Sequence, residues 1–368
     1  MAVGSAPDVV VIGAGAIGCS AAYYLARAGA RVTVVERGEI GREASWASAG
    51  MVSALPPGDD PLSRFYREGA ALFPEFAAAI RAETGIDIGY WRCGSLRLCR
   101  NAAEWEMWEA EFQMLRDGGV TVERWSGDEV RSRAPALAPD TAGALYFPTA
   151  GQVRPPRFVR ALAAGAARHG AHFRTGEPVI GLARAGERVT GIVTPSGTLA
   201  AGTIVVAAGA WSGEIARFVP HAVPVAPARG QIVLLETMPP RVATLVFDGD
   251  FYLTPRPDGK VLLGSTVEFV GFERGTTAEG VHELLRKGLA AAPGLRQSRF
   301  VTAWAGLRPY GGRDAPLIGP LPGHEEIVLA TGHFRTGISP ALITGQMVAD
   351  WITTRQTSIP LAPFAPGA

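Results

Sequence analysis

The sequence is poor in cysteine, and its charges are nearly balanced. Among 368 residues there are three cysteines, Cys19, Cys93 and Cys99, so they cannot all pair. Five residues separate Cys93 from Cys99, which is the wrong spacing for a dithiol redox motif. This cysteine usage is typical of a reducing compartment. The formal net charge is +1, with arginines scattered among acids, so there is no basic stripe for nucleic acid.

Targeting signals and membrane-length apolar runs are also absent. Residues 1–7 hold no basic segment followed by an apolar core, so no secretory signal is predicted. The longest apolar run is the opening stretch, where glycines and Arg27 favour a buried strand–helix unit over a membrane span. We find no internal repeat, low-complexity tract, long Pro/Gly linker or metal-ligand set. The sequence therefore predicts a soluble, cytoplasmic protein without a nucleic-acid or membrane partner.

The opening stretch carries the strongest pattern in the chain. An apolar run, Val9–Ile12, leads into Gly13-Ala14-Gly15-Ala16-Ile17-Gly18, and helical apolar spacing follows to Leu25. The first glycine permits a tight turn, the second lets the backbone approach a pyrophosphate, and the third lets the helix lie close to the strand. The helix start then offers free N–H groups and a positive dipole end to phosphates.

An acidic residue completes this pattern. A second strand, Arg31–Val35, ends at Glu36, which stands 18 residues past Gly18. A carboxylate there can accept hydrogen bonds from a ribose diol, and it prefers a free 2′-hydroxyl to a 2′-phosphate. A glycine turn alone is weak evidence, but strand, turn, helix, second strand and acid within about 30 residues predict an ADP-containing dinucleotide.

The rest of the chain mixes helical and strand patterns. Helical spacing covers 60–83, 101–117, 157–169, 278–291 and a run ending near 354, and strands are expected at 90–99 (a strand pair), 144–147, 178–182, 189–193, 203–206, 231–235, 251–254, 261–264 and 327–332. The length suits two domains. We predict an α/β fold in which a Rossmann-like FAD-binding domain (1–88, 142–223 and 305–368) is interleaved with an α+β substrate-binding domain (89–141 and 224–304) built on a mainly antiparallel sheet.

Six further motifs follow the glycine turn in a fixed order. They are a small-residue run ending Ala49-Gly50-Met51, VVAAGAW at 205–211, FYLTPR at 251–256 with DG at 258–259, GST-E at 264–268, AGLRP at 305–309 and ATGHFRTGI at 330–338. Through these seven motifs, nearly the whole chain resembles the D-amino-acid oxidase family of FAD-dependent oxidoreductases. It is most similar to the glycine oxidase branch, which supplies the imine for the thiazole of thiamine.

The resemblance implies a reaction and a set of substrate-binding residues. Hydride would pass from Cα of a small amino acid to flavin, the imine would hydrolyse to a 2-oxo acid and ammonia or an amine, and O₂ would reoxidise the flavin to give hydrogen peroxide. Arg308 and Tyr252 match the residues that hold the substrate carboxylate, which suits a guanidinium fork and a phenol donor. Arg335 matches a position near the amino acid and the flavin edge, and Met51 matches a pocket wall. By themselves, both arginines would be assigned to structural ion pairs, for example with Asp314.

The same resemblance implies FAD contacts along the whole FAD-binding domain. The matching residues are Gly13, Gly15, Ala16, Ile17, Gly18, Glu36, Arg37, Ala44, Ser45, Ser48, Ala49, Gly50, Met51, Val179, Ala208, Gly209, Trp211, Gly306, Arg308, His333, Phe334, Arg335, Thr336, Gly337 and Ile338. We expect His333 to pack or cap a turn, because hydride transfer requires no base at Cα. Relatives of the sarcosine-oxidase type attach flavin to a cysteine near the C-terminal part, and this chain has none after Cys99, so FAD should be non-covalent.

Three other functions stay open from the sequence. One is a D-amino-acid dehydrogenase that passes electrons to a quinone or another acceptor, and another is a non-catalytic flavoprotein. The third is a NAD-dependent dehydrogenase. A flavoenzyme that also binds NAD(P)H is disfavoured, because the chain has one complete dinucleotide pattern. Similarity to glycine oxidases also suggests a homo-oligomer, a homotetramer in those enzymes.

Overall fold

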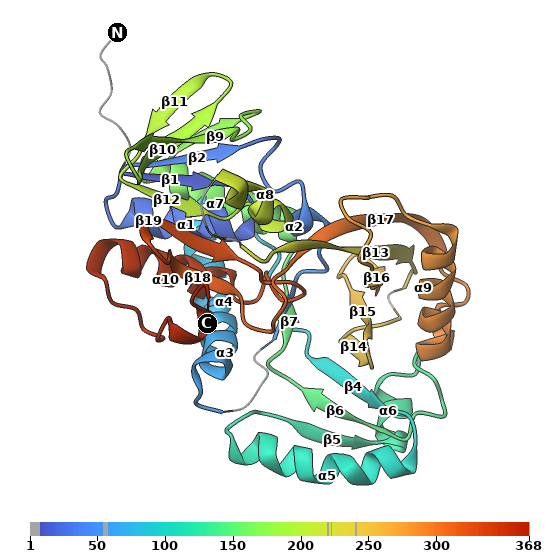
Figure 1. The fold of residues 1–368 in the computed structure, drawn as a ribbon. Coiled ribbons are helices and arrows are strands. Elements are labelled where there is room, and N and C mark those ends of the chain that lie inside the picture. The colour runs from blue at the N-terminus through green and yellow to red at the C-terminus, as the bar shows by residue number, and fades with distance from the viewer. Residues whose placement is uncertain (1–7, 54–57, 219–220, 222, 240, 368) are drawn as a thin grey trace.

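The computed structural model describes residues 8–53, 58–218, 221, 223–239 and 241–367. Two large sheets organise this part of the chain, and they occupy different halves of the molecule in Figure 1. Helices pack against both sheets, and residues 8–53, 58–84 and 317–367, near the two ends of the chain, lie in the same half (Figure 1). No helix among the described residues is both long and apolar enough to cross a membrane.

The first sheet has six strands in the order β18-β19-β12-β1-β2-β8. β1 (Val9–Ile12), β2 (Val32–Glu36), β8 (His172–Thr175), β12 (Thr203–Val206) and β19 (His324–Thr331) are parallel, whereas β18 (Leu317–Leu321) pairs antiparallel with β19. The central strand β1 is buried on both faces, which explains its uninterrupted apolar sequence.

Each face of this sheet packs against a different layer. On one face, Val9 and Val11 share a core with α1 (Ala16–Arg27), α7 (Pro155–Arg168) and α10 (Ala341–Thr354), and α3 (Pro61–Ala71) and α4 (Phe73–Thr84) extend that core. On the other face, Val10 and Ile12 pack against a three-stranded antiparallel sheet of β9 (Gly181–Ala185), β10 (Arg188–Thr194) and β11 (Gly197–Ala200). Small residues bring α1 and α10 close, because a Cβ on Gly345 would overlap Ser20.

The second large sheet has eight strands in the order β17-β13-β16-β15-β14-β4-β6-β5. These are β17 (Arg299–Tyr310), β13 (Ala226–Glu236), β16 (Lys260–Gly264), β15 (Phe251–Pro255), β14 (Leu245–Asp248), β4 (Ser95–Cys99), β6 (Gly143–Phe147) and β5 (Glu123–Ser126). Every neighbouring pair is antiparallel except β14 and β4. The helix α9 (Ala278–Ala291) packs against this sheet and closes a second core.

The remaining elements of the described residues lie outside these three sheets. β3 (Met51–Val52) pairs with β7 (Gly151–Gln152), and α2 (Ala44–Ala47) contacts β17. The others are α5 (Ala102–Asp117), α6 (Gly127–Arg133), α8 (Ser212–Ile215) and four 3₁₀ turns, η1 (Gly209–Trp211), η2 (Ala216–Phe218), η3 (Pro293–Leu295) and η4 (Ala362–Phe364).

The fold class predicted from the sequence is confirmed, with differences in detail. The helix expected at 60–83 is two helices, because Pro74 begins a new one at α4. The strand pair expected at 90–99 is wrong: β4 is a single strand, and Trp91 makes only an isolated bridge to Gln152. The predicted domain limits split off β6 and the end of β17, both of which pair within the eight-stranded sheet. The division into domains itself stays a prediction.

Candidate active site

A cavity of about 540 Å³ lies where the carboxyl ends of β12 and β19 meet one face of the eight-stranded sheet. In parallel sheets this edge is the usual place for a ligand, because the loops after the strands converge there. Nineteen of the residues predicted from the sequence line it: Gly15, Ala16, Ile17, Ala44, Ser45, Ser48, Ala49, Gly50, Met51, Gly209, Tyr252, Gly306, Arg308, His333, Phe334, Arg335, Thr336, Gly337 and Ile338. The structure therefore brings together segments that are far apart in the sequence.

The glycine turn between β1 and α1 is tightly packed. Gly13 has φ +102°, and a Cβ there would lie 2.5 Å from the carbonyl oxygen of Ala207. A Cβ on Gly18 would overlap the carbonyl oxygen of Gly13. Both positions therefore require glycine. The turn in this form brings the backbone of Gly15 and the first residues of α1 to the cavity wall.

Two side chains hold this turn in place. One carboxylate oxygen of Glu36 accepts from the backbone N–H of Ala14 at 2.9 Å, and the other accepts from Gly38 at 2.9 Å. The hydroxyl of Ser45 accepts from the backbone N–H of Ala16, also at 2.9 Å. Glu36 thus fixes the turn, and its predicted contact with a ribose stays a prediction.

Arg308 lines the cavity, and three hydrogen bonds fix the position of its guanidinium. Its Nη1 donates to the carbonyl oxygens of Thr266 (3.0 Å) and Arg229 (3.5 Å), and its Nη2 donates to the Ser265 hydroxyl (2.6 Å). The guanidinium also covers Gly230, where a Cβ would overlap it. Burial lowers the pKa of Arg308, but an arginine stays cationic. Its described acceptors are carbonyl and hydroxyl groups, so Arg308 is not the ion-pair partner of Asp314.

Tyr252 stands beside Arg308 on the same cavity wall. The phenol ring lies against Gly264, where a Cβ would overlap it, and the residue is 7% exposed. The neighbouring phenol offsets part of the effect of burial on Arg308, whose pKa still lies below its usual value. Ile232, Met51 and Phe247 pack around this ring in an apolar cluster. This part of the cavity thus combines one cation and one phenol with apolar walls.

Arg335 lies at a more exposed part of the cavity wall. Its Nη1 donates to the Asp250 carboxylate and its Nη2 to the Asp250 carbonyl oxygen, both at 3.1 Å. The ion pair expected for this arginine therefore exists, with Asp250 in place of Asp314. Arg335 also lowers the pKa of Arg308, so the two cations act on the same region. Asp250 follows Gly249 in the turn between β14 and β15, and sequence reasoning missed it because its importance depends on a residue 85 positions away.

His333 is buried in the cavity wall. Its Nε2 lies 3.0 Å from the Thr344 hydroxyl, and its Nδ1 has no hydrogen-bond partner among the described residues. Burial lowers the pKa of His333 to about 3, so the imidazole is neutral near pH 7. An unpaired buried nitrogen is costly unless a ligand completes it. His333 thus packs in the cavity wall as expected, and its unpaired Nδ1 is itself buried.

Several predicted FAD contacts lie outside the cavity wall: Gly13, Gly18, Glu36, Arg37, Val179, Ala208 and Trp211. The guanidinium of Arg37 stacks over Trp211, 3.5 Å from the ring centroid, and Val179 packs in the core beneath the three-stranded sheet. The contacts of these seven residues with FAD stay predictions. Conversely, the cavity includes residues that the sequence did not single out, among them Ser265, Asp250 and Arg97. Ser265 belongs to the GST-E motif, and this motif is the feature of the sequence that could have identified it as a cavity residue.

These features fit a dinucleotide with a flavin ring. Gly15, Ala16 and Ile17 line the cavity at the start of α1, and a helix N-terminus is a favourable place for a phosphate. Small residues leave room along the wall: Ala44, Ser45, Ala47, Ser48, Ala49 and Gly50. The model of the DAO family, described as FAD dependent oxidoreductase, matches residues 8–351. The chain belongs to the DAO family.

Individual relatives of this DAO-family chain agree over its full length. It is 34% identical to the glycine oxidase of Pseudomonas putida, with 98% of both sequences aligned. The crystal structure of glycine oxidase from Geobacillus kaustophilus matches it with a TM-score of 0.93 and 32% identity, covering 98% of each chain. Iminodiacetate oxidase from Chelativorans sp. BNC1 matches with a TM-score of 0.89 and 28% identity, covering 97% of this chain and 98% of that one. The predictions of family and of FAD as cofactor are confirmed.

Proposed function

We propose that this DAO-family enzyme oxidises glycine and other small primary or secondary amino acids, including D-isomers, and passes the electrons to O₂. The observation that carries the proposal is the placement of Arg308 and Tyr252 on one wall of the cavity that the glycine turn also lines. A cation and a phenol on an apolar wall suit a carboxylate. The names of the two relatives at 34% and 32% identity support glycine as a substrate.

In this proposal, the residues bind and orient the substrate. Arg308 binds the carboxylate. Its hydrogen bonds to the Ser265 hydroxyl and the Thr266 carbonyl fix the orientation of the guanidinium for this role. Tyr252 donates a further hydrogen bond without adding charge. Apolar side chains such as Met51 and Phe247 exclude water from the rest of the substrate. When bound, FAD supplies the hydride acceptor, while the protein fixes the position of the reacting Cα.

The amine must be neutral for the substrate to lose hydride. Asp250 is the one acidic side chain among the described residues that line the cavity, and it is paired with Arg335. The wall therefore provides no free carboxylate to hold an ammonium group. The substrate loses one hydride from Cα and one proton from nitrogen to give an imine, which water hydrolyses to a 2-oxo acid and ammonia or an amine. Reduction of O₂ to hydrogen peroxide consumes the two electrons.

The proposal is tested with the FAD-loaded protein. It is titrated without oxygen with glycine, sarcosine, D-alanine and D-proline while flavin absorbance is followed, and air is then admitted and peroxide assayed. Bleaching followed by rapid recolouring with peroxide is the expected result, and the order of substrates reports the pocket size. Bleaching without recolouring would assign a dehydrogenase with another acceptor. A yellow protein that no amino acid bleaches would overturn the proposal.

Three expectations from the sequence stay predictions. They are the non-covalent attachment of FAD, the cytoplasmic location and the homotetramer.

A further inference from the structure

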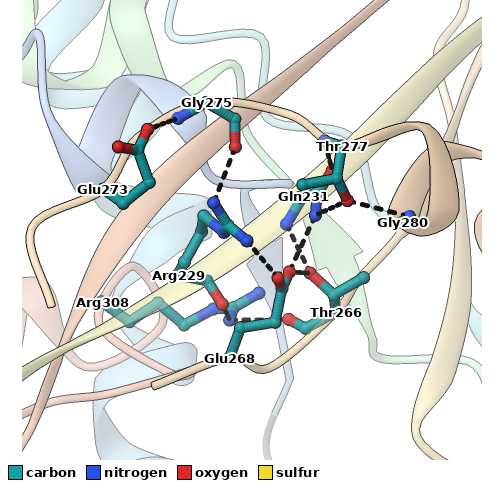
Figure 2. Close-up of polar contacts among 9 residues, drawn as sticks. All are labelled: Arg229, Gln231, Thr266, Glu268, Glu273, Gly275, Thr277, Gly280 and Arg308. Carbon is teal, nitrogen blue, oxygen red and sulfur yellow. Dashed lines mark hydrogen bonds and ion pairs between the residues drawn. The ribbon is translucent and has the colours of Figure 1, made fainter. Parts of the chain in front are cut away.

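A polar network lies behind Arg308, on the face of β13 that is turned away from the cavity. Side chains alternate along a strand, and Gly230 and Ile232 line the cavity, so Arg229 and Gln231 point to the opposite face. Arg229 is 5% exposed and Gln231 is fully buried. Figure 2 shows both side chains meeting Glu268, which comes from the loop 265–277 between β16 and α9.

Glu268 is the centre of this network. Its Oε1 accepts from the Thr266 hydroxyl at 2.5 Å and from the Gln231 amide at 2.8 Å, and its Oε2 accepts from Arg229. Burial acts to raise the pKa of Glu268, but the hydrogen bonds from Arg229, Thr266 and Gln231 outweigh it and hold the pKa below its usual range. The carboxylate is therefore ionised and paired with a buried guanidinium.

The network fastens the loop at both of its ends. Near the start, Arg229 and Glu268 exchange backbone hydrogen bonds of 2.8 and 3.0 Å, and the Gln231 N–H donates to the Thr266 hydroxyl at 2.9 Å. Near the end, Arg229 donates to the Gly275 carbonyl at 3.1 Å, and the Gln231 amide accepts from the Thr277 N–H at 2.8 Å. Thr277 in turn caps α9. The loop thus has a fixed position relative to β13.

The same loop and strand hold Arg308 from their other side. The Thr266 carbonyl and Ser265 hydroxyl come from the loop, and the third acceptor is the backbone carbonyl of Arg229 itself. Any shift of the loop along β13 would move at least two of these three acceptors. The orientation of Arg308 therefore depends on the contacts of Glu268, although Glu268 contributes no atom that binds its guanidinium among the described hydrogen bonds.

Stability alone is a poor explanation for this arrangement. Removing a carboxylate and a guanidinium from water is expensive, and an apolar pair of similar size often stabilises a fold as well or better. The Nε of Arg229 is also buried without a partner among the described residues, which adds to the cost. A buried charged pair does, however, specify one geometry, because its hydrogen bonds are directional.

We propose that the Glu268–Arg229 pair positions the Arg308 guanidinium to receive the substrate carboxylate. The inference rests on the proposed function, since it assigns Arg308 as the carboxylate ligand. Glu268 and Arg229 are positioning residues that act through Thr266 and Ser265. Without the pair, the loop relaxes and Arg308 loses its defined direction while it keeps its charge.

The test measures carboxylate binding separately from turnover. The FAD-loaded protein is titrated with acetate, which has a carboxylate but no amine to oxidise, and binding is followed by the change in the flavin spectrum. Glu268→Ala should raise the Kd for acetate roughly 10- to 100-fold, the effect of misplacing a binding group by about 1 Å. FAD content should be unchanged. Glu268→Gln keeps the acceptor for Thr266 and Gln231 and loses the charge, so its effect should be in the same direction and smaller.

Glu273→Ala is the matched control, because it removes a carboxylate from the same loop. Glu273 is exposed, and its described contact is the Gly275 N–H at 2.8 Å. This variant should bind acetate within about twofold of the unmodified protein, the scatter of independent sites. If Glu273→Ala weakens acetate binding as much as Glu268→Ala does, general loosening of the loop explains the result and the inference fails.

A double-variant cycle tests whether Glu268 acts through Arg308. With Arg308→Ala already in place, Glu268→Ala should change kcat/KM for glycine by less than about twofold, because no positioned group is left to disturb. A full, independent loss in that background would contradict the inference.

The outcomes also separate the proposed function from the inference about Glu268. If Arg308→Ala itself leaves acetate binding intact, the carboxylate assignment fails, whereas if only Glu268→Ala has no effect, positioning by Glu268 fails.

Discussion

The glycine turn and the part of the cavity around Arg308, Tyr252 and Ser265, called the arginine wall below, line the same cavity. The two regions differ in how far apart in the sequence their residues lie. The turn, its helix and the Glu36 carboxylate all come from residues 8–36, and Ser45 adds one contact from just beyond them. The arginine wall needs Arg308 together with Arg229, Tyr252 and the loop at 265, from four separate segments. The turn is specified by shape, since a Cβ at either of two positions would meet backbone. The arginine wall is specified by hydrogen bonds that hold one cation.

The largest expected effect comes from adding a methyl group to the turn. In Gly18→Ala, the new Cβ would overlap the Gly13 carbonyl, which is backbone and cannot move without opening the turn. The substitution should cost about 3 kcal/mol of stability or more and abolish FAD binding. Flavin content after purification and the denaturation midpoint measure both effects. Gly181→Ala is the control, because a Cβ there meets Val193 at an ordinary 3.6 Å. Full FAD occupancy in Gly18→Ala would contradict this account of the turn.

A substitution in the arginine wall should slow the reaction and leave FAD binding unchanged. Arg308→Ala removes the cation and leaves the glycine turn untouched, so FAD should stay bound. The transition state for glycine oxidation should lose roughly 2–5 kcal/mol, measured as kcat/KM, because one partner of a desolvated charge pair is gone. Arg299→Ala, on the same strand but exposed and paired with Glu236, should be near neutral. An unchanged kcat/KM in Arg308→Ala would remove the basis for the proposed function.

Acid should destabilise the fold through His333, which is buried in the wall of the same cavity. An unfolded histidine has a pKa near 6.5, whereas burial lowers that of His333 to about 3. Between these values the unfolded chain binds a proton that the folded chain does not, so the free energy of unfolding falls as pH falls. Urea unfolding of the FAD-loaded protein at several pH values should show this slope, and His333→Gln should reduce it. The exposed His282→Gln should leave the slope unchanged.

The smallest expected effect concerns the apolar wall. Met51 packs with Phe247 and Tyr252, and its removal would widen the cavity. Met51→Ala should therefore raise the ratio of kcat/KM for D-proline to that for glycine by about 1 kcal/mol, chiefly through KM. Met114→Ala, whose side chain is exposed on α5, should leave the ratio as it is. A ratio that stays constant in Met51→Ala would show that Met51 does not limit substrate size.

The comparison also explains what the sequence could predict. The glycine turn was predictable from local physics, because three glycines, an apolar strand and Glu36 fall within one short stretch. The central helices and most strands followed from periodicity for the same reason. The break at Pro74 and the whole of β17, where no strand was expected, were missed, since each depends on packing or pairing partners that the spacing of apolar residues does not reveal.

The arginine wall was predictable only through resemblance to a family. Nothing near Arg308 in the sequence distinguishes a carboxylate ligand from an arginine in a surface ion pair. Its acceptors Ser265 and Thr266 are more than 40 residues away, and Asp250 is 85 residues from the arginine that it binds. The role of Glu268 was likewise invisible until the loop was seen against β13 (Figure 2). Such sites are defined by contacts between distant segments.

The most direct test of the central claim compares glycine with glycinamide, which replaces the carboxylate with a neutral amide of similar shape. Initial rates in air give kcat/KM for both substrates, in the unmodified enzyme and in Arg308→Ala. We expect a strong preference for glycine in the unmodified enzyme, and we expect Arg308→Ala to lose most of that preference by losing glycine oxidation. If both proteins discriminate to the same extent, Arg308 does not hold the substrate carboxylate, and the account of this cavity is wrong.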